Sequence, residues 1–174
     1  MRKVILGVAV SLDGFIEGPN GEYDWCFTDQ DYGLSDFFKQ IDTIFMGRKS
    51  YELSLTLPAE ENPWKGMATY VFSNSLKEVK GENVKLISGN IEAQLADVLK
   101  QPGKDIWMFG GAELLTTFVN NGWIDEYWLS VHPIVLGSGK PLFQNIRERK
   151  KLKLVHHKVY ETGLVSLRYQ PVRS

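Results

Sequence analysis

The sequence predicts a three-layer α/β fold in which helices cover both faces of a mostly parallel central sheet. Short apolar segments alternate with amphipathic ones up to about residue 122, an order typical of parallel strands joined by crossover helices. Beyond that point, β-rich segments flank glycine-containing turns, which predicts a C-terminal antiparallel hairpin. The 174 residues contain no linker or repeat, so we expect one domain over residues 1–174.

Five segments rich in β-branched and other apolar residues are expected to form the parallel strands. The first is almost entirely apolar and ends at Asp13-Gly14, which indicates a strand buried on both faces. The five strands are Val4–Ser11, Thr43–Met46, Thr69–Phe72, Val84–Ile87 and Asp105–Phe109. A longer strand follows at Ile124–Val135, and Lys151–Tyr160 and Leu164–Val172 form the hairpin around Glu161-Thr162-Gly163.

Four segments between these strands are expected to be helical. Apolar side chains recur at helical spacing in the first of them. Asn90 has the features of an N-cap, with Ala93 as the third residue of the helix that follows. The expected helices are Gln30–Gln40, Gly47–Leu53, the segment between Asn90 and Gln101, and Ala112–Asn120.

Composition excludes several functional classes. The net charge of −1, from 20 basic and 21 acidic residues, gives no basic excess for binding nucleic acid. No apolar stretch approaches the roughly 20 residues that span a bilayer, and no signal-peptide cleavage site follows the first apolar segment. The single cysteine, Cys26, excludes an internal disulfide and fits a reducing cytoplasm, where we expect the protein to be located.

Metal-ligand and phosphate-loop motifs are missing from the sequence. His156 and His157 are adjacent on a predicted strand, so their side chains point to opposite faces. His132 has no cysteine or carboxylate partner at ligand spacing. Gly-x-Gly-x-x-Gly does not follow the first strand, and Gly137-Ser138-Gly139-Lys140 precedes a proline instead of the Ser or Thr of a P-loop. We expect no metal site and no kinase or ATPase chemistry.

Three predicted strands end alike, with small or polar residues that begin a turn or helix. The carboxyl ends of parallel strands line one crevice, helix N-termini bind anions, and glycine lets the backbone approach a phosphate. Each junction alone also fits an ordinary turn, but together they predict an anion- or nucleotide-binding crevice. The junctions are Met46-Gly47-Arg48-Lys49-Ser50, Phe72-Ser73-Asn74-Ser75 and Phe109-Gly110-Gly111-Ala112.

Two aromatic residues, Trp25 and Tyr51, lie beside the predicted crevice elements. Either side chain could stack on the planar ring of a ligand or pack in the core with its polar tip exposed. The sequence favours neither interpretation.

Six short motifs occur in a characteristic order along nearly the whole chain. They are Ser11-Leu12-Asp13-Gly14-Phe15-Ile16, Asp24-Trp25, Met46-Gly47-Arg48-Lys49-Ser50-Tyr51-Glu52, Phe72-Ser73-Asn74, Phe109-Gly110-Gly111-Ala112-Glu113-Leu114 and Leu136-Gly137-Ser138-Gly139. In these motifs the chain resembles the dihydrofolate-reductase-like superfamily. It resembles most the branch that contains the reductase domain of the bifunctional riboflavin-biosynthesis deaminase-reductase and its stand-alone bacterial relatives.

The resemblance implies an NADPH site beside a substrate site. The implied cofactor residues are Ala9 and Ile16 at the nicotinamide, Gly47, Arg48, Lys49 and Ser50 at the phosphates, Ser73 and Asn74 near the adenosine 2′-phosphate, and Phe109, Gly110, Gly111, Ala112 and Glu113 around the pyrophosphate. The implied substrate residues are Ser11, Asp13, Trp25, Tyr51 and Ser130.

Two positions depart from the family pattern. Folate reductases carry a carboxylate on the first helix where this chain has Leu34, with Asp31 three residues earlier, so folate reduction is not expected. Asn74 replaces an arginine found in many members, which leaves Arg48 and Lys49 to favour NADPH over NADH.

The expected activity is hydride transfer from NADPH to a small heterocyclic, pyrimidine- or pteridine-like substrate, resembling 5-amino-6-(5-phosphoribosylamino)uracil reductase. The proton is expected from Asp13, Asp31 or water, in that order. The alternative is a non-catalytic nucleotide- or metabolite-binding module on the same fold, because the acidic helix residue is missing. The exposed hairpin edge, together with the resemblance, predicts a homodimer.

Overall fold

The computed structural model describes residues 1–58, 60 and 62–173. Its helices are α1 (Leu34–Gln40), α2 (Arg48–Ser54), α3 (Ile91–Lys100) and α4 (Ala112–Asn120). Its strands are β1 (Val4–Ser11), β2 (Phe15–Glu17), β3 (Ile41–Gly47), β4 (Ala68–Phe72), β5 (Val84–Ile87), β6 (Asp105–Gly110), β7 (Glu126–His132), β8 (Lys140–Pro141), β9 (Leu152–Val159) and β10 (Val165–Pro171).

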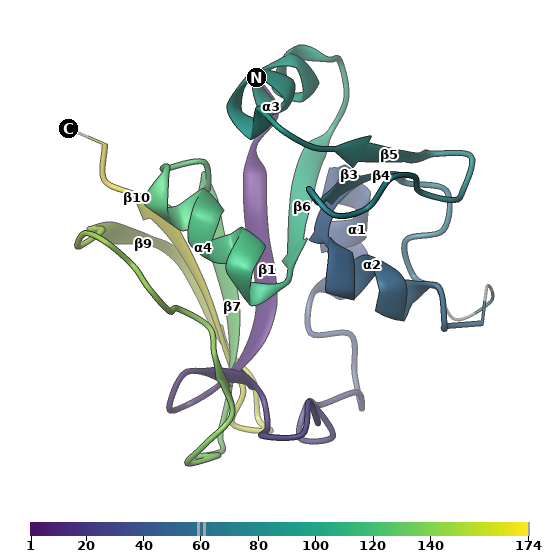
Figure 1. Ribbon diagram of the computed structural model, residues 1–174. Coiled ribbons are helices and arrows are strands. Elements are labelled where there is room, and N and C mark those ends of the chain that lie inside the picture. The colour runs from purple at the N-terminus through teal and green to yellow at the C-terminus, as the bar shows by residue number, and fades with distance from the viewer. Residues whose placement is uncertain (59, 61, 174) are drawn as a thin grey trace.

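Eight of these strands form one sheet in the order β5-β4-β3-β6-β1-β7-β10-β9, with β1 near its centre (Figure 1). Every neighbouring pair from β5 to β7 is parallel, whereas β10 runs antiparallel to both β7 and β9. The expected α/β fold, with a mostly parallel sheet and a C-terminal antiparallel hairpin, is confirmed.

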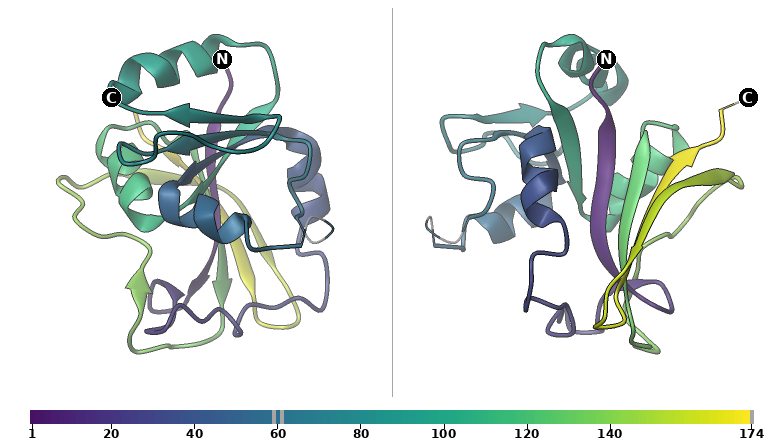
Figure 2. Two further views of the ribbon diagram at one scale, coloured as in Figure 1. Left: turned by 45° about the vertical axis from the view of Figure 1, so that its right-hand side comes forward. Right: turned by 180° about the vertical axis from the view of Figure 1, so that it is seen from behind.

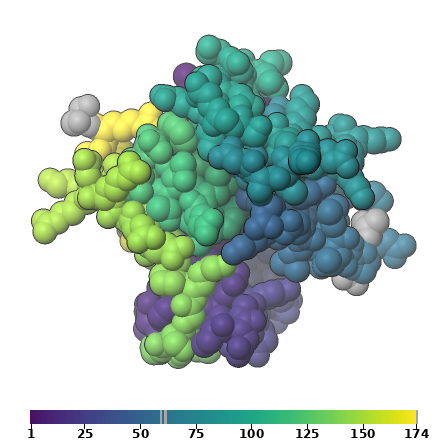
Figure 3. Space-filling model, in the orientation of Figure 1, coloured from purple at the N-terminus to yellow at the C-terminus, as the bar shows by residue number. Residues whose placement is uncertain are grey.

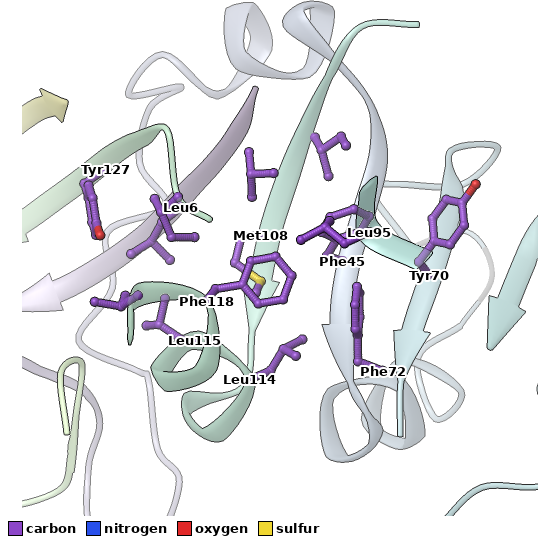
Figure 4. Close-up of a cluster of buried hydrophobic side chains, with 14 of the residues drawn as sticks. Leu6, Phe45, Tyr70, Phe72, Leu95, Met108, Leu114, Leu115, Phe118 and Tyr127 are labelled. Carbon is purple, nitrogen blue, oxygen red and sulfur yellow. The ribbon is translucent and has the colours of Figure 1, made fainter. Parts of the chain in front are cut away.

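Helices cover both faces of this sheet, so the molecule has three layers (Figure 2). On one face, α3 and α4 pack on the largest buried cluster, where the ring of Phe118 meets those of Phe45 and Phe72 (Figure 4). On the other face, Phe37 of α1 and Tyr51 of α2 are the buried residues of their helices. Full burial of a side chain such as Phe118 contributes roughly 1.5–3 kcal/mol to folding.

The first helix is shorter than the pattern of apolar residues predicted. Helix α1 begins at Leu34 instead of Gln30, because Tyr32 and Gly33 adopt positive φ angles of 51° and 87°. The carboxylate of Asp31 accepts hydrogen bonds from the backbone N–H groups of Gly33 and Ser35. These bonds stabilise a turn at the residues that were predicted to form the first helical turn.

Other boundaries also differ from the prediction. Strand β7 covers Glu126–His132 instead of Ile124–Val135, and Pro133, which has no N–H to donate, directly follows its end. Strands β2 and β8 were not predicted, because two or three residues are too few to show alternation. They form a separate antiparallel pair. The Asn90 cap is confirmed, since its Oδ1 accepts from the Ala93 N–H at 3.1 Å.

In the parts of the chain that the structure describes, none of the helices combines the length and the apolar character needed to cross a bilayer.

Candidate functional site

A pocket of about 570 Å³ lies where the parallel strands end. Its walls come from the start of α2, the end of β4, the start of α4 and the β2–β8 pair; α2, α4 and the segment around β8 meet on the face shown in Figure 3. The three strand-end junctions therefore lie together, as the topology of a parallel sheet requires. Ten predicted cofactor residues line the pocket: Ile16, Gly47, Arg48, Lys49, Ser50, Ser73, Asn74, Gly111, Ala112 and Glu113.

The N-terminus of α4 supplies free backbone donors to this pocket. Gly111 is its N-cap without a side-chain hydrogen bond, and the Leu115 N–H donates to the Gly111 carbonyl as the helix begins. The N–H groups of Ala112, Glu113 and Leu114 therefore have no partner within the helix. Free N–H groups and the helix dipole together favour an anion at this point.

Two glycines keep the approach to these donors open. A Cβ atom on Gly47 would stand 3.6 Å from the Gly111 backbone nitrogen, and one on Gly111 would stand 3.7 Å from the Ser50 Oγ. Side chains here would occupy the space between the start of α2 and the start of α4. The resulting cradle fits the phosphates of a dinucleotide, to which the backbone must come close.

Charged side chains border the cradle in pairs. Arg48 Nη1 lies 3.1 Å from Glu52 Oε1, and Lys140 Nζ lies 3.6 Å from Glu17 Oε2. These pairs are partly exposed, so each contributes little to stability and can exchange for a ligand anion. Lys49 adds a third cationic side chain to the pocket lining.

The β4 end contributes polar atoms with defined partners. Ser73 Oγ accepts from the backbone N–H groups of Ser75 and Leu76, at 3.2 and 3.1 Å. Asn74 Oδ1 accepts from the Gly89 N–H at 2.9 Å, so its amide nitrogen remains available to donate to a ligand.

Three predicted cofactor residues do not line this pocket. Ala9 lies opposite Ser130 in the β1–β7 register and is half-buried. Phe109 packs against Trp64, with ring centroids 4.9 Å apart. Gly110 lies opposite Met46 in the β3–β6 register, and its peptide bond to Gly111 is cis.

Tyr51 does not face a ligand surface. Its side chain is 5% exposed, and its hydroxyl accepts a hydrogen bond from the Lys80 N–H at 2.7 Å. Of the two interpretations, core packing is the one that the structure supports. Ser11 is also buried, and its hydroxyl donates to Asp13 and accepts from the Phe15 N–H. Both hydroxyl groups are engaged in hydrogen bonds within the protein.

Trp25 lines a second cavity of about 310 Å³, together with Asp24, Cys26, Phe27 and the His132–Ile134 segment. Ser130 lies two residues before His132 on the same face of β7, and its side chain is half-buried. The predicted substrate residues Trp25 and Ser130 are thus near the end of β7, whereas Tyr51 is in the core.

Neither predicted proton donor has the environment of an acid. Asp13 accepts from the Ser11 hydroxyl and from the N–H groups of Leu136 and Gly137, and these bonds lower its pKa. Asp31 accepts from the hydroxyl and N–H of Ser35, which lowers its pKa as well. Both carboxylates are therefore ionised at neutral pH and have no proton to give.

Sequence reasoning missed several residues of the two cavities. Glu17 and Lys140 enter the large pocket through the β2–β8 pair. The glycine-rich segment before Lys140 was assessed as a P-loop and as a family motif, but no site residue was assigned to it. His132 was considered only as a metal ligand, and it lines the second cavity. In the described residues, no group of three or more His, Cys, Asp or Glu side chains could hold a metal ion.

Known proteins share both the sequence and the architecture. The uncharacterized protein YyaP of Bacillus subtilis (strain 168) is 47% identical over 178 residues, covering 97% of this chain and 94% of its own length. A Shewanella sp. PV-4 structure described as a riboflavin-biosynthesis protein is 25% identical with a TM-score of 0.84, covering 99% of this chain and 100% of its own.

Dihydrofolate reductase from Enterococcus faecalis, solved with NADP(H) and RAB-propyl, has the same fold with a TM-score of 0.69 at 18% identity, covering 97% of this chain and 96% of its own. The model of the RibD C-terminal domain matches residues 2–166. The chain therefore has the architecture of an oxidoreductase, and it belongs to the RibD C-terminal domain family.

Proposed function

We propose that this protein binds NADPH and catalyses hydride transfer to a small heterocyclic substrate of the pyrimidine or pteridine kind, in a reaction resembling that of 5-amino-6-(5-phosphoribosylamino)uracil reductase. The observation that carries the proposal is the 570 Å³ pocket, which combines free N–H groups of α4 with cationic side chains of α2. The related dihydrofolate reductase fold, solved with NADP(H), supports the choice of cofactor.

Different residues of the pocket suit different phosphates of the cofactor. Backbone N–H groups of Ala112 and Glu113 suit the pyrophosphate, because they are fixed donors that need no reorganisation. Arg48 and Lys49 suit the 2′-phosphate, since the long Arg48 side chain can leave Glu52 and Lys49 adds a second positive charge. When bound, the cofactor supplies the hydride, and the protein supplies orientation and electrostatics.

Ligand-induced stabilisation tests the cofactor. At a free concentration of 100 Kd, a ligand adds about 2.7 kcal/mol, which raises Tm by about 5–10 °C for a chain of this size. NADPH is expected to produce this shift at a lower concentration than NADH. Absence of a shift with either nucleotide would overturn the proposal.

A screen for substrates follows from the same preparation. NADPH oxidation is measured by absorbance against pyrimidine, pteridine and quinone-like acceptors, with the protein omitted as the control. Turnover with a pyrimidine or pteridine acceptor supports the proposed reaction, whereas turnover with quinones alone contradicts the proposed substrate class.

A non-catalytic binding module is the second candidate, and one observation favours it. Asp13 and Asp31 are engaged by neighbouring donors in their ionised forms, so neither of the two expected side-chain donors is held ready to give a proton. Tight NADPH binding without oxidation across the acceptor panel would favour this candidate over the reductase.

A further inference from the structure

A histidine connects the end of β7 to the segment between β2 and α1. His132 is the last residue of β7 and is 3% exposed. Its Nδ1 lies 2.9 Å from the carbonyl oxygen of Ser130, and its Nε2 accepts from the backbone N–H of Phe27 at 3.1 Å. Because a carbonyl can only accept and an N–H can only donate, these contacts define a ring protonated on Nδ1 and free to accept on Nε2.

Aromatic contacts extend this attachment along the segment. The His132 ring packs edge-on against Trp25 at 5.3 Å and lies 5.0 Å from the Phe27 ring. Phe27 stacks on Tyr32 at 6.1 Å, and Tyr32 meets Tyr160 beside the hairpin turn at 4.9 Å. The segment therefore lies on the sheet through a continuous row of rings that begins at His132.

The attached segment and His132 together line the 310 Å³ cavity. The indole Nε1 of Trp25 is buried and has no hydrogen-bond partner among the described residues. A buried donor without a partner costs about 1–3 kcal/mol, so the Trp25 ring depends on its packing against His132 to keep this position.

We propose that His132 is a positioning residue that fixes the 24–27 segment and so holds the Trp25 ring at the wall of this cavity. A planar heterocycle has the shape to pack against such an aromatic wall. This choice of ligand rests on the proposed function, whereas the attachment of the segment by His132 does not.

Protonation of His132 breaks the attachment. A proton on Nε2 would set two N–H donors, those of His132 and Phe27, against each other. Burial lowers the pKa of His132, so the folded state binds fewer protons at this site than the unfolded state. The attachment is therefore intact above the usual histidine pKa of 6.5 and is lost as the pH falls through the lower pKa of the folded state.

Other titratable groups near the His132 ring do not account for the pH dependence of the attachment. Asp24 and Cys26 face the same cavity from the segment, and burial raises the pKa of the Cys26 thiol to about 11. From β1, the Val10 backbone favours the protonated ring, and Ser11, opposite His132 in register, is hydrogen-bonded to Asp13. The Cys26 thiol keeps one protonation state while His132 titrates, and the Asp13 carboxylate is ionised throughout because its pKa is lowered.

Hydrogen exchange at the Phe27 amide tests the proposal directly. Protection factors, corrected for the intrinsic exchange rate at each pH, are measured by NMR from about pH 8 to about pH 5. The variants are His132→Phe, which keeps a ring without an acceptor, and His132→Gln, which keeps an acceptor that does not titrate in this range. The matched control is His157→Phe, because His157 is exposed on β9.

The four proteins are expected to show three patterns. In the unaltered protein, protection of the Phe27 amide falls as the pH is lowered; in His132→Phe it is about tenfold lower throughout, as for the loss of one hydrogen bond. His132→Gln restores protection and removes its pH dependence, and His157→Phe behaves like the unaltered protein. Equal protection in His132→Phe, or a pH dependence that persists in His132→Gln, would overturn the proposal. If His132→Phe does not fold, the pH dependence in His132→Gln decides.

Kinetics give a second readout if the reductase activity is found. His132→Phe is expected to raise KM for the acceptor about tenfold, with NADPH affinity unchanged because the cofactor pocket has separate walls. His132→Gln is expected to restore the KM. Failure of NADPH to bind would contradict the proposed function alone, since the exchange experiment needs no ligand.

Discussion

At the scale of single residues, the carboxylate of Asp13 connects two segments that are 123 positions apart in the chain. One oxygen accepts from the Leu136 N–H and the other from the Gly137 N–H, at 3.1 and 2.8 Å. Its lowered pKa follows from these donors and from the Ser11 hydroxyl, so the charged form is the one that the fold stabilises. In the structure Asp13 therefore tethers two segments, and its role as a proton donor stays a prediction.

Replacing Asp13 tests this tether. Asp13→Asn is expected to lower the free energy of unfolding at neutral pH, because an amide NH₂ would face the Gly137 N–H. Since the folded pKa lies below the usual 3.8, the contribution is present above that value and disappears as the pH falls through the folded pKa. Urea denaturation of both proteins at neutral pH and near pH 3 checks this. The exposed Asp97→Asn on α3 is the control, and an equal deficit at both pH values would contradict the prediction.

Among the cationic side chains of the pocket, Arg48 is the one whose loss should weaken NADPH binding most. Arg48→Ala is expected to raise the Kd for NADPH about tenfold and the Kd for NADH less, because a charged hydrogen bond to phosphate is lost from a side chain that is 43% exposed. Calorimetric titration with each nucleotide gives both constants. Arg173→Ala, on the C-terminal tail, should leave them unchanged; an equal loss for NADPH and NADH would exclude phosphate recognition by Arg48.

At the scale of elements, the N-termini of two helices differ in how their backbone N–H groups are satisfied. Helix α3 has a side-chain cap, whereas α4, which faces the pocket, has none. A side-chain cap would occupy the same N–H groups that a ligand anion needs. The capped N-terminus of α3 is therefore structural, whereas the N–H groups at the uncapped N-terminus of α4 are available for binding.

The cap of α3 can be tested by substitution. Asn90→Ala removes the acceptor for the Ala93 N–H and is expected to cost about 1 kcal/mol of stability. Asn90→Asp keeps an acceptor and should remain near the original stability. Thermal unfolding of the three proteins measures the effect, and NADPH binding should stay unchanged in all of them. A loss in Asn90→Asp equal to that in Asn90→Ala would argue against the cap.

The β2–β8 pair depends on one close backbone contact. A Cβ atom on Gly139 would lie 2.1 Å from the Glu17 carbonyl oxygen, and the φ angle of Gly139 is +143°. Gly139→Ala is therefore expected to destabilise the protein by about 1–3 kcal/mol and to weaken ligand binding at the adjoining pocket. Gly137→Ala is the control, since it also has positive φ but its Cβ would meet nothing within 4 Å. Denaturation of both variants compares them, and equal losses would exclude the contact as the cause.

At the scale of the whole molecule, the sheet ends in an edge strand that is exposed along its full length. Each residue of β9 is exposed, including the apolar Leu154, Val155 and Val159. An unpaired edge with apolar side chains is prone to association unless another chain covers it. The expectation of a homodimer remains a prediction, and β9 is the edge to which it applies.

Light scattering coupled to size exclusion tests this expectation. The unaltered protein should elute with the mass of a dimer, and Val155→Lys should shift it toward the monomer by placing a charge on the edge. Val172→Lys, at a more exposed position in the tail, is the control. A monomer at micromolar concentration would contradict the prediction of a dimer.

The amino-acid sequence alone determined the order of the elements other than β2 and β8, and the location of the pocket at the strand ends. The preferences of residues close together in the chain act locally. Such residues form the apolar segments that predicted β1, β3, β4, β5 and β6, and they also form the Asn90 cap. Because the ends of parallel strands must meet at one edge, the three junctions could be placed together before any contact was known.

Only the tertiary structure decided what individual side chains do. Whether Tyr51 faced the core or a ligand, whether Asp13 was an acid or a tether, and whether His132 had a partner all depended on residues far away in the chain. The β2–β8 pair, with its glutamate and lysine, likewise forms between segments about 120 positions apart. Sequence periodicity carries no information about such contacts, because they arise when the packed sheet brings distant loops to the same edge.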